Sequence, residues 1–226
     1  MIQPVQNIPN NHPNVVKPRF SSHKITLAPD YNRVKSKEAP ASVKAASAIG
    51  AAAGAALAVA AFAKRQKKSF FNVEYGLKEM LGLGLGAIGG GVLGGVLTSN
   101  RKKHERKLDE GIFQYSMVAL PGFAVSGATY ACEKIKPLNN APAKIAGTVL
   151  ALAGGMEVAV DVANFVSDID NNEPDRKLTF KDAIASVDDI IGILVLAKIK
   201  AVKTLKLERL LPAVYAYCGY KAGTTN

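Results

Sequence analysis

The chain has 226 residues, of which 48% are hydrophobic and 21% charged, and its formal net charge is +11 at pH 7. Its two cysteines, Cys132 and Cys218, cannot form a disulfide framework, and neither they nor the three histidines have zinc-ligand spacing. The basic residues mostly flank apolar stretches, which favours a membrane protein over a nucleic-acid reader with its cations on one face.

Residues 1–44 form a basic segment rich in proline and asparagine. Six prolines within the first 40 residues interrupt any helix or central strand, and no apolar core of signal-peptide length is present. We therefore expect a disordered arm, whose basic residues keep it in solvent or place it on anionic lipid.

Two charge-free stretches follow, at residues 45–63 and 80–100. Twelve of the nineteen residues in the first are alanine, and the second contains eight glycines. Small residues recur every four positions, which places them on one helix face and allows close helix approach. The repeats are Ala46, Gly50, Gly54 and Ala58 in the first stretch, and Gly82, Gly86, Gly90 and Gly94 in the second. They predict an antiparallel hairpin of two membrane spans, although the first stretch also suits a soluble alanine-rich helix.

A second hairpin is expected from residues 111–132 and 143–166. The first stretch is uncharged but carries Pro121 near its middle, which a membrane helix tolerates as a kink. The second repeats small residues at Gly147 and Gly155. The sequence thus predicts an all-α membrane bundle of about four glycine- and alanine-rich helices in two hairpins, spanning residues 45–166.

Residues 167–226 are expected to form an acidic loop and a basic helical tail. Within the loop, Asp168, Asp170 and Asn172 stand at the first, third and fifth positions of a pattern that resembles an EF-hand calcium loop. Asp182 is the candidate that closes the site. Glu173 replaces the turning glycine, and the loop is longer than the EF-hand pattern allows. Calcium is the only cofactor that the sequence suggests, and a solvated acidic linker is the alternative.

Glu157 and Asp161 lie four residues apart inside the fourth apolar stretch, so they share a helix face. Ionisable groups within a bilayer suggest an ion or proton path, while a position at the interface is the plainer interpretation.

Residues 84–89 match the GxGxxG pattern, but no strand precedes them, so nucleotide binding is not expected. No histidine accompanies a nucleophile, and we expect no enzyme activity. The expected partners are the lipid bilayer and, through the glycine faces, a second copy of the chain. Nucleic acid is not an expected partner.

The leading hypothesis is a non-enzymatic integral membrane protein with structural or self-associating roles. The alternatives are an ion or proton channel or transporter, a membrane-inserting toxin or effector, and a soluble helical protein. Basic residues beside the spans favour an orientation with both termini in the cytoplasm.

Overall fold

The computed structural model describes residues 38–167 and 207–226. Five α-helices lie in these residues: α1 (Ala41–Gln66), α2 (Leu77–Thr98), α3 (His104–Lys134), α4 (Ala141–Ser167) and α8 (Leu211–Thr224). Short 3-10 turns join or precede them: η1 (Phe70–Asn72), η2 (Arg101–Lys103), η3 (Lys136–Leu138) and η4 (Leu207–Leu210). The described part of the chain contains no strand, so the all-α prediction is confirmed. Helix α1 begins four residues before the expected boundary at Ala45.

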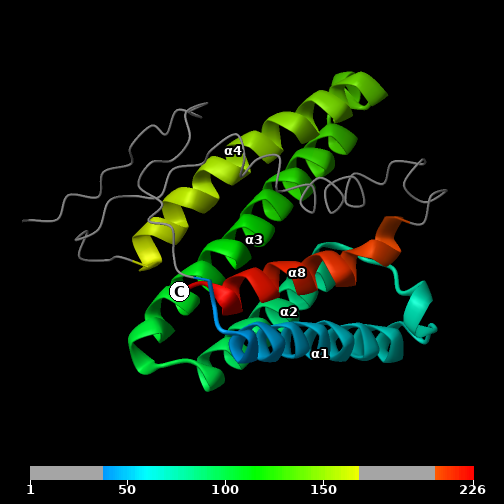
Figure 1. The fold of residues 1–226 in the computed structure, drawn as a ribbon. Helices are drawn as coiled ribbons and strands as arrows, with labels where there is room; N and C mark the ends of the chain where they lie inside the picture. Colours follow the sequence, from blue (N-terminus) through cyan, green and yellow to red (C-terminus); the bar gives the residue numbers. More distant parts are fainter. Residues whose placement is uncertain (1–37, 168–206) are drawn as a thin grey trace, which may run out of the picture.

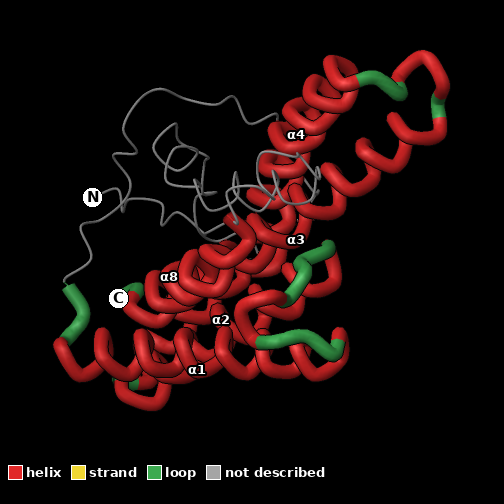
Figure 2. The backbone as a smooth tube through the Cα atoms, turned by 90° about the vertical axis from the view of Figure 1, so that its right-hand side faces the viewer, coloured by secondary structure: helices red, strands yellow, loops and turns green. Residues whose placement is uncertain are grey.

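The helices form two packed groups (Figures 1 and 2). Helices α1 and α2 lie antiparallel, and α8 packs along both of them to make a three-helix unit. Helices α3 and α4 form a hairpin that contacts this unit through the first part of α3 and then extends away from it. The start of α1 and the end of α8 lie at the same end of the three-helix unit, beside the α2–α3 turn.

Local sequence explains where α1 and α2 begin and end. Helix α1 starts directly after Pro40, and it ends where Lys67 adopts the left-handed conformation and the Lys68 N–H donates to the Ala63 carbonyl at 3.0 Å. Helix α2 starts after Gly76, whose N–H donates to the Glu79 side chain at 3.1 Å. A carboxylate in the first turn also suits the positive end of the helix dipole.

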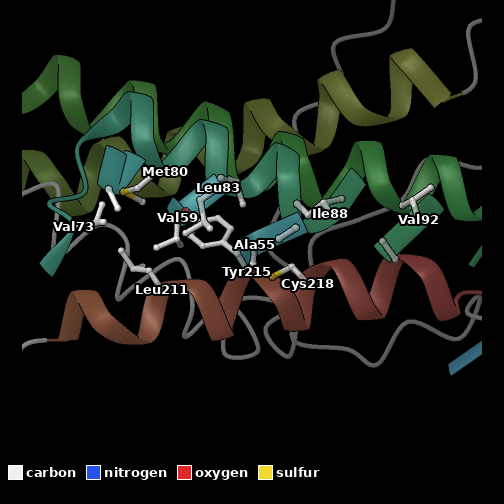
Figure 3. Close-up of a cluster of buried hydrophobic side chains, with 14 residues drawn as sticks. Ala55, Val59, Val73, Met80, Leu83, Ile88, Val92, Leu211, Tyr215 and Cys218 are labelled. Carbon is white, nitrogen blue, oxygen red and sulfur yellow. The ribbon is translucent and has the colours of Figure 1, made fainter. Parts of the chain in front are cut away.

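The core of the three-helix unit is apolar and is drawn in Figure 3. Leu83 of α2 lies beside Val59 of α1 and Tyr215 of α8, and Ile88 lies farther along α2 in the same cluster. Leu211, at the start of α8, is fully buried in this core. Because α8 contributes side chains to the centre of the unit, it is part of the core and not an appended tail.

A second apolar cluster holds the α3–α4 hairpin together. Phe113 and Met117 of α3 pack against Met156 and Val160 of α4. Helix α4 begins after Asn140, whose side-chain oxygen accepts a hydrogen bond from the Ala143 N–H at 2.9 Å and caps the helix.

Three helices in the described residues are long and apolar enough to cross a membrane: α1, α2 and residues Pro142–Ser167 of α4. Residues 111–132, the third expected span, lie within α3, which is helical throughout but is not one of these three. The structure therefore supports a membrane protein with three candidate spans, and the expected count of four is not confirmed.

Candidate functional site

One face of α2 contacts α1 through glycine backbones. A Cβ atom on Gly54 would lie 2.7 Å from the carbonyl carbon of Gly86, and one on Gly50 would lie 2.9 Å from the carbonyl carbon of Gly90. Real Cβ atoms do not approach other atoms this closely, so only glycine permits the observed distance between the two helices.

The same face continues toward both ends of the α1–α2 contact. A Cβ on Gly94 would lie 2.7 Å from the Ala46 carbonyl carbon, and one on Gly86 would lie 3.3 Å from the Ala58 side chain. Gly82 differs, since its nearest neighbour is the ring of Phe62 at 2.7 Å. The structure thus brings together seven of the eight small residues that the sequence analysis singled out in these two helices, and Gly82 packs against Phe62 instead.

A second glycine face of α2 receives α8. A Cβ on Gly95 would lie 2.8 Å from both the Cα and the carbonyl carbon of Gly223, and one on Gly91 would lie 2.9 Å from the Gly219 Cα. Gly91 and Gly95 lie four residues apart on this face, and the sequence analysis did not identify α8 as their partner. The available signal was the four-residue spacing of Gly219 and Gly223, which continues a face that begins with the buried residues Leu211 and Tyr215.

The end of α8 is held by a buried cation. Lys107, with no exposed surface, donates through Nζ to the carbonyl oxygens of Gly223 and Thr225, each at 2.7 Å. A cation at the carboxyl end of a helix satisfies its free carbonyls and suits the helix dipole. Burial, and secondarily the charge of Lys103, lower the pKa of Lys107 below its usual value.

The predicted small residues of α4 face α3. A Cβ on Gly155 would lie 2.7 Å from the Pro121 Cα, and one on Gly147 would lie 3.3 Å from the sulfur of Cys132. Gly155 therefore makes room for the proline in the facing helix. Cys132 and Cys218 are both buried free thiols.

The two acidic residues of α4 differ in exposure. Glu157 is exposed on the outer face of the hairpin, and Asp161 is half-buried. The predicted calcium ligands Asp168, Asp170, Asn172 and Asp182 all lie outside the described residues. Within residues 38–167 and 207–226, no group of three or more histidine, cysteine, aspartate or glutamate residues could hold a metal ion.

The outward faces of the candidate spans carry large apolar side chains. Leu57 of α1 is 72% exposed, Leu97 of α2 is 75% exposed and Leu150 of α4 is 73% exposed. Ile49 and Leu93 continue these faces on α1 and α2. Exposed apolar side chains on several faces are typical of contact with lipid or with another protein.

The loop between α1 and α2 contains Tyr75, whose ring packs partly against the three-helix core. Burial, and secondarily the charge of Glu208, raise the pKa of Tyr75 from 10.0 to about 12. At the same end of the unit, Arg209 donates to the Asn72 side chain at 3.0 Å and ties the start of α8 to the loop.

Comparison with known proteins finds no family, no curated protein and no solved structure that matches this chain.

Proposed function

We propose that this chain is a non-enzymatic integral membrane protein whose glycine faces lock its helices together. The exposed leucines of α1 and α2 carry this proposal. These helices place the backbones of Gly50, Gly54, Gly86 and Gly90 against each other and turn Leu57 and Leu97 outward. A water-soluble helix pair does the reverse, because leucine gains more free energy from burial than glycine or alanine. Glycines at the helix contact and large exposed leucines on the outer faces suit a lipid solvent.

The proposal extends to four spans in two hairpins, with α3 as the additional span. Packing of Pro121 against Gly155 supports it, because a proline inside a membrane helix is tolerated where a neighbouring helix covers the gap. The shared position of the α1 start and the α8 end supports both termini on one side of the membrane. The basic residues beside them favour the cytoplasm.

The glycine faces of α2 are occupied within the chain, by α1 and by α8. The proposed self-association therefore uses the outward apolar faces or a rearrangement that displaces α8. Chemical crosslinking in native membranes, compared with crosslinking in detergent, would show whether copies associate.

Extraction tests the central proposal. An integral protein stays in the membrane pellet after washing with alkaline carbonate and enters the supernatant only with detergent. Release by carbonate alone contradicts the proposal. A membrane-inserting toxin or effector is distinguished by a soluble form that releases trapped dye from vesicles when it inserts.

A second candidate function, an ion or proton path, rests on Glu157. This carboxylate is exposed on a candidate span, where a charged group facing lipid is costly unless water or another subunit covers it. Asp161 lies one turn away on the same helix. Ion or proton flux into vesicles that is lost in Glu157→Gln would support this function, and the absence of any flux contradicts it.

A further inference from the structure

Salt bridges and hydrogen bonds hold the loop between α1 and α2 in one shape. Arg65 forms an ion pair with Glu79, and Lys68 Nζ lies 2.8 Å from a carboxylate oxygen of Glu74. The Gln66 side chain donates to the Glu74 main-chain oxygen at 2.7 Å and accepts from its N–H at 2.9 Å. Glu74 of the loop and Glu79 at the start of α2 therefore both have ion-pair partners within the chain.

What remains on the loop surface is basic and aromatic. Lys64, Lys67 and Lys78 are exposed, and none has an ion-pair partner among the residues that the structure describes. Phe70 and Phe71 stack edge to face with ring centroids 5.3 Å apart, and Phe71 is 72% exposed. We call these five residues the basic–aromatic surface.

Three of the basic residues at the opposite end of the unit are used differently. Lys103 donates to the Asn226 side chain at 3.2 Å, and Arg106 donates to the Asn226 main-chain oxygen at 3.3 Å. Lys107 caps α8, as described above. Three cations there serve the packing of α8, whereas the three lysines of the basic–aromatic surface are left for a partner outside the described fold.

We infer that the basic–aromatic surface binds the headgroups of anionic lipids in the leaflet that it faces. Lysines beside a membrane are attracted to lipid phosphates, and exposed aromatic rings next to them enter the interface between headgroups and acyl chains. The surface joins two helices that are long and apolar enough to span the membrane, which places it at headgroup depth. The inference rests on the proposed function and adds lipid selectivity to it.

The absence of tryptophan from the sequence allows a direct test. Phe71→Trp introduces a single fluorescent reporter into the full chain. The variant is reconstituted in bilayers of phosphatidylcholine and phosphatidylglycerol at a fixed ratio, with bromine quencher carried by one lipid or by the other. We expect stronger quenching by brominated phosphatidylglycerol, corresponding to an about fivefold local enrichment, the size expected for one lysine at an anionic surface.

Variants without the lysine charges, compared with a control at the opposite end of the unit, test whether these charges cause the lipid preference. The same reporter with Lys64, Lys67 and Lys78 all changed to Gln should show no preference between the two brominated lipids. The reporter with Arg101→Gln and Lys102→Gln, at the opposite end, should keep the preference. Added salt should weaken the preference as charges are screened. Inorganic phosphate at constant ionic strength should not abolish it, which separates a lipid site from a free-phosphate site.

Each outcome is decisive. Equal quenching by the two lipids refutes the lipid selectivity and leaves the membrane proposal standing. Quenching by neither lipid, together with release by carbonate, refutes the membrane proposal itself. Loss of the preference upon addition of phosphate alone replaces the lipid site with a phosphate site.

Discussion

Three consecutive glycines of α2 have three different surroundings, and this difference predicts opposite effects of one substitution. A Cβ on Gly89 would have nothing within 4 Å. A Cβ on Gly90 would lie 2.9 Å from the Gly50 carbonyl carbon, and a Cβ on Gly91 would lie 2.9 Å from the Gly219 Cα. Replacement of each glycine by alanine therefore compares an open position, the contact with α1 and the contact with α8 within one helical turn.

The expected magnitudes follow from two opposing terms. Alanine is favoured over glycine inside a helix by about 1 kcal/mol, so Gly89→Ala should raise the free energy of unfolding by up to about 1 kcal/mol. At Gly90 and Gly91 the neighbouring carbonyl groups must retreat by about 1 Å to restore ordinary contact, and overpacking of this kind costs about 1–3 kcal/mol. We expect a net loss of up to about 2 kcal/mol, or a folded-to-unfolded ratio up to roughly 30-fold lower.

The assay is equilibrium unfolding in mixed detergent micelles, followed by circular dichroism, for the three variants and the unaltered chain. Gly90→Ala and Gly91→Ala should unfold at lower denaturant, and Gly89→Ala at the same or higher denaturant. If all three substitutions stabilise the protein equally, helix propensity alone governs these positions and the close backbone packing inferred for α2 is wrong.

Three further predictions concern the capping residues and Tyr75. Lys107→Met should leave the last carbonyls of α8 unpaired, destabilise its docking by about 1–3 kcal/mol and speed thiol labelling of the buried Cys218, whereas Lys102→Met should not. Stability contributed by the protonated phenol of Tyr75 is present below pH 10 and should be lost as the pH rises toward 12, because the pKa is higher in the folded state. In an absorbance titration of the phenol groups, Tyr75→Phe should remove the ionisation step near pH 12. The same substitution should leave the absorbance change near pH 10 unaltered. Asn140→Ala should cost about 1 kcal/mol and raise amide hydrogen exchange in the first turn of α4.

The sequence predicted the parts of the packing site in which small residues repeat every four positions within one helix. Gly86 and Gly90 lie one helical turn apart, and so do Gly50 and Gly54, so each row follows from helical periodicity alone. Pairing of the two rows also follows from proximity, because the connection between the helices is short. The lengths of the charge-free stretches predicted α1 and α2 as apolar helices, and the length of the fourth apolar stretch predicted α4, since length and composition are properties of the chain itself.

The role of α8 could not be read in this way. Gly219 and Gly223 are separated from Gly91 and Gly95 by more than 120 residues, and nothing local indicates which of several glycine rows they contact. Lys107 presents the same difficulty. It lies in a run of charged residues at the start of α3, where solvent exposure is the ordinary expectation, yet it is fully buried against the end of α8.

The amino-acid sequence by itself thus determined the helices and their apolar character, together with the small-residue rows, because these depend on neighbours within a few residues. Only the tertiary structure decided which rows meet, which lysines are buried or left on the surface, and how α8 completes the unit. Those outcomes depend on contacts between distant segments, whose free energies arise only once the helices have packed.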